Sequence, residues 1–336
     1  MDHQLIRHYR SFHDGIVFSN DSANLARLRQ NMESELRVKW DSKPEKLVGI
    51  NLEYEQDSIF LSQHLLINQV IDKFKSRIQP NIIPTYTPLP GDNLVTSWGD
   101  PVEPTLYQSF IGSINYMALG TRPDLSYAVN YLARFSANPN ETHWAALKHL
   151  IQYIATTRTK RLRLQVTNDQ LIDWTDANWG GEFQRSTSGF IIYFLGSPIA
   201  WGSRRQKVVA TSTCAAEFIA LGSSVDFLLF LIPIIKSLDV NPSIVLKCDN
   251  RAAVLVSDDN ASKGRMKSLE LGPASQPVGT WQLTCDKSQL PFGPVINVCC
   301  DNLAVSLVSR KPDDPLIVSE NDFITKFACR EVSNSI

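Results

Sequence analysis

The chain has 336 residues, of which 43% are hydrophobic and 20% are charged, and its formal net charge is −1. This composition is typical of a globular protein with roughly two or three domains, and the charge argues against a generally basic nucleic-acid binder. The most apolar run, residues 227–235, is shorter than a membrane helix and contains Pro233, so we expect no membrane association. The N-terminus lacks the apolar core of a signal peptide, and the six cysteines show no paired spacing, which indicates reduced thiols in an intracellular protein.

Local patterns predict mainly helices in the first half of the chain. Apolar residues at helical spacing indicate helices over residues 22–39 and about 63–78. Between them, residues 47–63 alternate in polarity around a polar turn at 56–58, which indicates two strands. A proline-rich connector over residues 79–104 separates these elements from two further helices.

The two further helices are predicted to form a hairpin. Pro123 occupies a first-turn position, and an apolar stripe from Leu125 to Phe135 follows it. After a polar break, a second apolar stripe runs from Trp144 to Ile154. We therefore expect this region to be a helical connection.

From residue 162 onwards the pattern changes to short strands. The candidate strands cover residues 162–166, 171–176, 189–196 and 197–203. Gly196-Ser197 indicates a tight turn between the last two. A long helix over about 212–231, a buried strand over 243–249 and the start of another helix follow. This order predicts an α/β fold with a mixed sheet and helices on its faces.

Three acidic residues fall at chemically useful places in this pattern. Asp176 ends the strand over residues 171–176, Glu217 lies in the first turns of the long helix, and Asp249 ends the strand over residues 243–249. Ligands gather at the carboxyl ends of parallel strands, and carboxylates suit Mg²⁺ or Mn²⁺. Two such ions about 4 Å apart can activate a water and stabilise the leaving oxygen of a phosphodiester. Taken singly, each acid also fits an ordinary role as a helix cap, a turn residue or a solvated helix residue.

Local basic clusters are present although the net charge is close to zero. Arg204, Arg205 and Lys207 lie between a predicted strand and the long helix, and further clusters occupy residues 158–163 and 263–267. Charge runs of this size are usually solvated faces. The first cluster is also a candidate contact for nucleic-acid phosphates.

The residues that surround the three acids form an ordered series of motifs. In chain order the motifs are Asp176-Ala177-Asn178-Trp179, Arg185-Ser186-Thr187-Ser188-Gly189, Trp201-Gly202-Ser203-Arg204-Arg205-Gln206, Thr211-Ser212-Thr213-Cys214-Ala215-Ala216-Glu217-Phe218 and Cys248-Asp249-Asn250. Their order, spacing and residue types resemble the ribonuclease H domain of Ty1/copia-type retrotransposon Pol polyproteins. Residues 58–90 and 107–157 resemble the segment that joins the polymerase to ribonuclease H in those polyproteins, so the resemblance covers about residues 12–270.

The resemblance implies a fold and a division into domains. The fold is an α/β, ribonuclease H-like mixed sheet with flanking helices, preceded by a mainly helical reverse-transcriptase thumb/connection remnant. We expect a truncated palm/thumb remnant over residues 1–104, a helical connection over 105–161, a ribonuclease H-like domain over 162–270 and a divergent tail over 271–336.

The resemblance also assigns the site. Asp176, Glu217 and Asp249 match the family's catalytic, metal-binding acids. The fourth acidic position follows a Gly-Arg-Thr-Lys-His-Ile-Asp pattern in the family, and Glu270 stands here where the aspartate is expected. A glutamate can bind Mg²⁺, but its extra methylene moves the oxygens, and metal sites are sensitive to small displacements. Glu270 therefore ranks below the other three acids.

The polymerase part departs from the family pattern. The family carries a Tyr-Val-Asp-Asp hairpin, and the matching stretch here is Ser11-Phe12-His13-Asp14. Asp14 remains, but His13 replaces the first aspartate, and no stretch matches the fingers and most of the palm. We expect no DNA polymerisation by this chain alone.

A short segment of the site region recurs near the other end of the chain. Residues 244–257 and 296–309 are identical at eight of fourteen positions. The second copy contains Asp301 without further spaced acids to complete a site. We interpret it as a partial repeat in a rearranged element.

The expected function is ribonuclease H activity, in which two Mg²⁺ or Mn²⁺ ions support hydrolysis of the RNA strand of RNA–DNA hybrids. The expected partners are the hybrid, with Arg204, Arg205 and Lys207 on its phosphates, and other retroelement Pol fragments, without a membrane or a small-molecule cofactor. The expected localisation is intracellular, in cytoplasmic virus-like particles, in the nucleus or in both. The alternative is a catalytically inactive relic that keeps the fold and at most binds nucleic acid.

Overall fold

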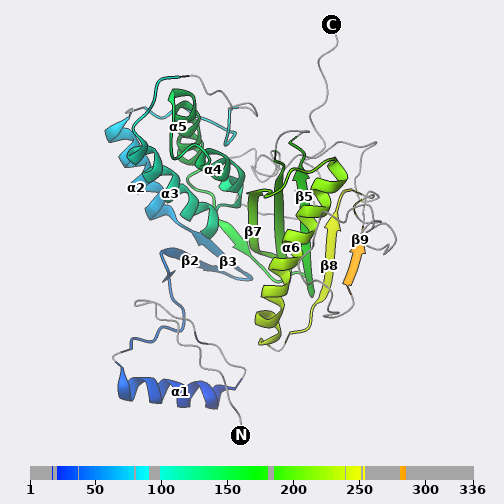
Figure 1. Ribbon diagram of the computed structural model, residues 1–336. Helices are drawn as coiled ribbons and strands as arrows, with labels where there is room; N and C mark the ends of the chain where they lie inside the picture. The colour runs from blue at the N-terminus through cyan, green and yellow to red at the C-terminus, as the bar shows by residue number, and fades with distance from the viewer. Residues whose placement is uncertain are drawn as a thin grey trace.

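The described part of the protein is built around two sheets, one of four strands and one of five. The computed structural model describes residues 17, 21–36, 38–78, 81–90, 99–180, 185–238, 240–250, 253 and 281–284 (Figure 1). A group of helices packs beside the four-stranded sheet, and one long helix packs on the five-stranded sheet.

The first helix, α1 (Ser22–Glu35), lies apart from the other elements in Figure 1 and has no fully buried side chain. Asp21 begins it, because its Oδ1 accepts a hydrogen bond of 2.8 Å from the N–H of Ala23. The predicted end at residue 39 was wrong, since Leu36 already takes an extended conformation.

The four-stranded sheet is antiparallel throughout and joins distant parts of the chain. Its strands in spatial order are β1 (Lys46–Leu47), β2 (Ile50–Glu55), β3 (Ser58–Ser62) and β4 (Leu162–Leu164). The hairpin between β2 and β3 turns at Gln56-Asp57, as the alternation predicted. Strand β4 comes about a hundred residues later in the chain, and its Arg163 lies opposite Phe60 on β3.

A helical unit packs beside this sheet. Its elements are α2 (His64–Arg77), α3 (Pro104–Gly120), the 3₁₀ helix η1 (Pro123–Leu125), α4 (Ser126–Ala133) and α5 (Glu141–Thr156). Their apolar faces share one core that includes Phe74, Phe110, Leu132 and Leu150. The helices around Pro123 and Trp144 confirm the expected hairpin, whereas the sequence patterns did not single out α3.

A buried ion pair at η1 is hydrogen-bonded to α5 and to the residue that ends it. Arg122 and Asp124 are both inaccessible to solvent, and Nη2 of Arg122 lies 2.7 Å from Oδ2 of Asp124. The hydroxyl of Tyr153 donates to the same carboxylate oxygen at 2.7 Å, and Arg122 donates to Oγ1 of Thr157 at 2.7 Å. These bonds satisfy charges that would otherwise be costly to bury.

The five-stranded sheet is mixed. Its strands are β5 (Gln170–Asn178), β6 (Thr187–Phe194), β7 (Ser197–Arg205), β8 (Ser243–Cys248) and β9 (Trp281–Thr284), and their spatial order is β7-β6-β5-β8-β9. Strands β5, β6 and β7 are antiparallel neighbours, whereas β8 runs parallel to β5 and β9 runs parallel to β8. The tight turn between β6 and β7 lies at Leu195-Gly196, one residue earlier than predicted, and both residues have positive φ.

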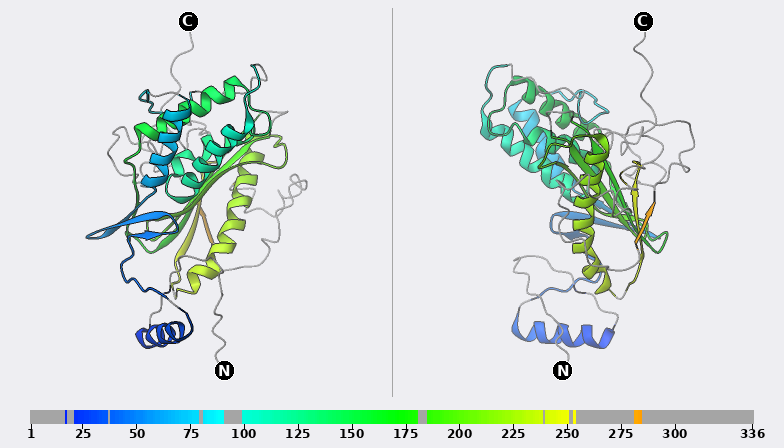
Figure 2. Two further views of the ribbon diagram at one scale, coloured as in Figure 1. Left: turned by 90° about the vertical axis from the view of Figure 1, so that its left-hand side faces the viewer. Right: turned by 45° about the vertical axis from the view of Figure 1, so that its right-hand side comes forward.

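The long helix α6 (Thr213–Lys236) covers one face of this sheet, and the helical unit covers the opposite face (Figure 2). On the α6 side, Leu228 and Ile232 share a core with Leu171 of β5. On the other side, Nε1 of Trp201 donates to the carbonyl of Ala118 in α3 at 2.6 Å.

Helix α6 is, among the described residues, the helix whose length and composition would allow it to cross a membrane. The predicted end of this helix at about residue 231 was wrong, because the helix continues past Pro233 to Lys236. Ile232 and Ile235 flank the proline and are buried against the sheet, so packing offsets the lost backbone hydrogen bond. The helix therefore packs one face on the sheet, while Phe227, Phe230 and Ile234 remain exposed.

The observed mixed sheet with flanking helices confirms the predicted α/β class. The predicted domain boundaries stay predictions; strand β4, placed at the start of the third domain, pairs with β3 of the first. His13, Asp14, Glu270 and the repeat around Asp301 lie outside the described residues.

Candidate metal centre

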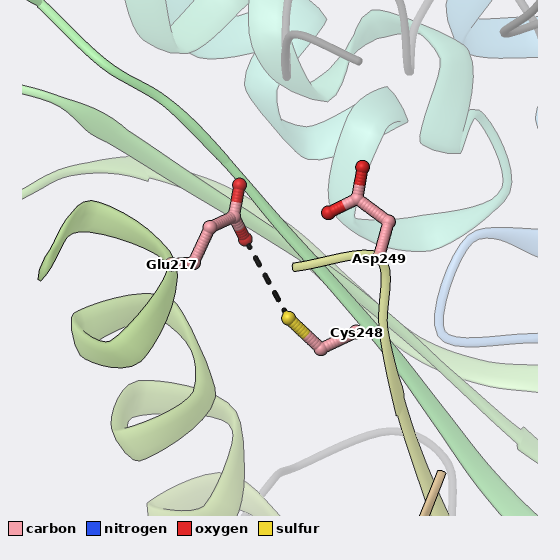
Figure 3. A group of neighbouring side chains, drawn as sticks. All are labelled: Glu217, Cys248 and Asp249. Carbon is pink, nitrogen blue, oxygen red and sulfur yellow. Dashed lines mark hydrogen bonds between the residues drawn. The ribbon is translucent and has the colours of Figure 1, made fainter. Parts of the chain in front are cut away.

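Three predicted site acids meet at one end of the five-stranded sheet. Asp176 lies near the end of β5, and Asp249 directly follows β8. These strands are parallel, and Thr175 lies opposite Cys248, so their carboxyl ends are side by side. Glu217 comes from the second turn of α6 and points toward the end of β8 (Figure 3).

Glu217 is the best-defined side chain of the group. Its Oε1 accepts a hydrogen bond of 3.1 Å from the backbone N–H of Ala177, and the thiol of Cys248 approaches Oε2 at 3.9 Å (Figure 3). One ligand atom each from Glu217, Cys248 and Asp249 lies within 4.8 Å of the other two. Glu217 and Cys248 are buried, whereas Asp249 is exposed, so the cluster opens to solvent at Asp249.

The electrostatics of Glu217 show how closely the acids lie. Burial is the main cause that raises the pKa of Glu217, to about 10, and the negative charges of Asp176 and Asp249 raise it further. A side-chain hydrogen bond with Asp176, which is itself only 4% exposed, also raises the pKa of Glu217. When carboxyl groups lie this close together, ionisation of all of them is unfavourable. A divalent cation bound between them would offset their mutual repulsion.

The donor set fits Mg²⁺ or Mn²⁺. Both cations prefer carboxylate oxygens and water, and the group offers three carboxylates with a solvent-facing member at Asp249. Asp176, Glu217 and Asp249 are therefore the residues that would hold the cation. Cys248 is a softer neighbour whose burial raises the pKa of its thiol.

Small side chains allow α6 to approach the end of β5. A separate apolar cluster consists only of alanines at its buried positions: Ala177, Ala210, Ala215, Ala216 and Ala220. Because alanine adds little volume between helix and strand, the Glu217 carboxyl group reaches the Ala177 N–H.

The basic residues predicted to contact nucleic acid lie at the same end of the sheet. Arg205 on β7 is paired with Thr187 on β6, which is paired with Asn178 on β5. Since neighbouring strands are about 4.8 Å apart, the backbone of Arg205 lies about 10 Å from that of Asn178. Arg204 and Lys207 are exposed beside Arg205.

The sequence motifs contained other residues whose contributions they could not reveal. The motifs included Cys248, Trp179 and Gln206, but the sequence pattern assigned them no role. In the structure each of them hydrogen-bonds to a group beside or within the centre. Trp179 and Gln206 donate to backbone carbonyls, and no pattern of residue types predicts such a bond. Glu270, the fourth predicted acid, lies outside the described residues, and its part in the site stays a prediction.

The mixed sheet with its covering helix is of the ribonuclease H-like α/β type. No family model matches the chain. It is 27% identical over 271 residues to the Retrovirus-related Pol polyprotein from transposon TNT 1-94 of Nicotiana tabacum, and this alignment covers 77% of the chain and 20% of that protein. It is 29% identical over 265 residues to the corresponding polyprotein from transposon RE2 of Arabidopsis thaliana, with 77% of the chain and 18% of that protein covered.

These similarities support a retrotransposon Pol fragment, and the chain spans about a fifth of the length of these relatives. A 121-residue stretch is also 38% identical to Secreted RxLR effector protein 161 of Plasmopara viticola, covering 35% of the chain and 85% of that protein. Among solved structures, LC11-RNase H1 in complex with RNA/DNA hybrid is 15% identical, covers 34% of the chain and 83% of that structure's chain, and has a TM-score of 0.27.

Proposed function

We propose that this chain is a ribonuclease H that hydrolyses the RNA strand of RNA–DNA hybrids. The observation that carries the proposal is the convergence of Asp176, Glu217 and Asp249 at one sheet end, close enough for both aspartates to raise the pKa of Glu217. These acids would bind two divalent cations, Mg²⁺ or Mn²⁺. When bound, such ions supply an activated water and charge stabilisation for the departing 3′ oxygen of the RNA.

The protein's own groups orient the site. The Ala177 N–H holds one oxygen of Glu217, which leaves the other oxygen directed toward Cys248 and Asp249 (Figure 3). The exposed position of Asp249 gives the scissile phosphodiester an approach from solvent. Fixing the carboxylates before substrate arrives lowers the cost of assembling the transition state.

The substrate would extend from the acids across the ends of β6 and β7. Arg204, Arg205 and Lys207 are exposed there, and their charges suit the phosphates of a polynucleotide. Such contacts position the strand but carry no sequence information. Selection of a hybrid over DNA would rest on its groove shape and the 2′-hydroxyls of the RNA strand.

The test is cleavage of an RNA–DNA hybrid labelled on the RNA strand, with Mg²⁺ present and with RNA-only and DNA-only duplexes as comparisons. We expect the purified chain to cut only the hybrid's RNA strand and Asp176→Asn to abolish cleavage. Asp226→Asn is the matched control, because Asp226 is an exposed acid on the same helix as Glu217.

Retained hybrid binding without cleavage by the unaltered chain would identify the inactive relic and overturn the catalytic proposal. Because the chain spans about a fifth of its relatives, other Pol fragments are proposed partners for any polymerase-linked role. We also propose an intracellular site of action, in cytoplasmic virus-like particles, in the nucleus or in both.

A further inference from the structure

The segment that joins β7 to α6, residues 206–212, is fastened at its start, near its end and at its last residue. Gln206 follows β7 and is only 4% exposed, and Ala210 is buried among the alanines of the site. Ser212 ends the segment and begins α6, because its Oγ accepts a hydrogen bond from the Ala215 N–H at 3.1 Å. Between these points, Val208 and Val209 are exposed.

Gln206 links the sheet to the helix through one amide group. Its Nε2 donates to Oγ of Ser188 on β6 at 2.9 Å and to the carbonyl of Ala216 on α6 at 2.8 Å. Its backbone N–H donates to the Ser186 carbonyl at 2.8 Å. The Ala216 carbonyl belongs to the peptide that leads into Glu217, so this amide acts directly on the backbone that carries the acid.

Trp179 makes the second link from the strand that carries Asp176. Its Nε1 donates to the carbonyl of Ala210 at 3.0 Å, while 37% of the residue remains exposed. The bond ties the residue three places beyond Asp176 to the segment that leads into α6. Thus β5, which carries Asp176, and α6, which carries Glu217, are both hydrogen-bonded to the segment 206–212.

We propose that Trp179 and Gln206 are positioning residues that set the register of α6 against β5 and so the spacing of Glu217 from Asp176. The proposal rests on the proposed metal-binding function of these acids. The alanine cluster brings helix and strand close, but contacts between methyl groups have little directionality, so the helix could slide along the strand. Hydrogen bonds from Trp179 and Gln206 have defined directions and remove that freedom.

A metal centre is sensitive to such a shift. Productive geometry requires ligands within about 0.5 Å, and groups that orient ligands without touching the metal influence affinity strongly. Loss of one positioning bond should therefore weaken cation binding more than it weakens the fold. This difference separates a positioning residue from an ordinary structural one.

The chain offers a matched pair of tryptophans for the test. Trp179→Phe keeps the ring and removes the N–H that bonds to Ala210, whereas Trp201→Phe removes an equivalent N–H that bonds to Ala118, away from the acids. The full chain and each variant are titrated with Mn²⁺ at low protein concentration, free Mn²⁺ is measured by electron paramagnetic resonance, and the melting temperature is recorded without metal.

We expect Trp179→Phe to raise the Mn²⁺ dissociation constant by about fivefold, the effect of one hydrogen bond near the centre, and Trp201→Phe to leave it unchanged. The two variants should lose similar amounts of thermal stability. Equal Mn²⁺ affinity in the Trp179→Phe variant and the unaltered chain would overturn the positioning proposal alone. A failure of the unaltered chain to bind Mn²⁺ would overturn the proposed function and this inference together.

Gln206→Met provides a second, independent variant. Methionine retains the length of the side chain but removes both donated bonds, so the Mn²⁺ dissociation constant should rise by more than in Trp179→Phe. Because Gln206 is buried, this variant is the more sensitive one to loss of the fold. If it does not fold, Trp179→Phe decides, since the partly exposed ring is retained there.

Discussion

The backbone N–H of Ala177 on β5 donates a 3.1 Å hydrogen bond to Oε1 of Glu217 on α6. This bond joins two residues 40 positions apart and fixes a helix carboxyl group at the end of a strand. It forms because the contact between helix and strand is made of alanines, and the cluster around it includes Ala216 and Ala220. The centre therefore depends on small side chains as much as on acidic ones.

The alanine contact can be tested by enlarging one member. Ala216 is fully buried, so Ala216→Leu should push α6 from β5, destabilise the protein by about 1–3 kcal/mol and weaken Mn²⁺ binding. Urea unfolding and Mn²⁺ titration measure the two effects. Ala133→Leu on the exposed side of α4 is the control and should change neither. Unchanged stability in Ala216→Leu would show that the contact is loose.

Metal affinity should depend on pH through Glu217. Its pKa is raised to about 10, first by burial and then by Asp176 and Asp249, so the metal-free protein holds this proton at pH 6–8. A cation must displace the proton, and affinity should rise with pH by up to about tenfold per unit. Mn²⁺ titrations at pH 6, 7 and 8 check this, and Glu217→Gln should bind weakly at every pH. A flat profile for the unaltered chain would contradict the expectation.

A second buried acid, Asp173, should make stability pH-dependent. It lies on β5 between Ile192 and Leu246 with Ser224 of α6 as its hydrogen-bonding neighbour, and burial raises its pKa from 3.8 to about 7. The folded protein then keeps a proton that the unfolded chain loses between about pH 4 and 7. Stability consequently falls as pH rises through this window, by up to about 1.4 kcal/mol per unit.

Replacement of the acid tests this sign. Asp173→Asn should unfold at a higher urea concentration than the unaltered chain at pH 8, and the difference should shrink toward pH 4. Asp226→Asn, at an exposed position, should show no such trend. A variant that is less stable than the unaltered chain at pH 8 would mean that the ionised carboxylate is well stabilised.

Removal of one partner of the buried Arg122–Asp124 ion pair should strongly destabilise the helical unit. Asp124→Asn leaves a buried guanidinium without its counter-charge and should cost about 3–5 kcal/mol in the free energy of unfolding. Glu33→Gln breaks the exposed pair with Arg29 on α1 and should cost less than about 1 kcal/mol. Comparable losses in both variants, measured by urea unfolding, would argue against the buried pair's importance.

The basic residues beside the acids should contribute to hybrid affinity through salt-sensitive contacts. Arg204→Ala and Arg205→Ala should each weaken binding and lower the slope of log affinity against log salt by somewhat less than one. Lys236→Ala, at the far end of α6, is the control and should leave that slope unchanged. Fluorescence anisotropy with the Asp176→Asn background prevents cleavage during the measurement. Identical slopes in all variants would remove these arginines from the proposed surface.

The local sequence pattern was sufficient to predict those helices and strands whose apolar residues recur with one regular period. The alternation around Gln56-Asp57 and the apolar stripe of α2 predicted their structures closely, because a regular period of apolar residues marks the buried face. The ending of α6 could not be read in this way. Its continuation past Pro233 depends on burial of Ile232 and Ile235 against the sheet, which is a tertiary effect.

The acids of the candidate centre were predicted because strand ends and helix starts are visible in sequence. Asp176 and Asp249 are brought together by the parallel pairing of β5 and β8, as that reasoning expected. The links made by Trp179 and Gln206 could not be predicted, since they end on backbone carbonyls of residues whose types carry no signal.

The pairing of β4 with β3 has a practical consequence for anyone who produces the ribonuclease H-like part alone. A product that begins at residue 162 would carry Leu162–Leu164 without its partner strand, and unpaired backbone edges recruit other chains. Expression from about residue 168 would leave that strand behind. The shorter product would also expose Trp201, whose indole N–H donates to the carbonyl of Ala118 in the full chain. Replacement of Trp201 by a polar residue should therefore favour a soluble product.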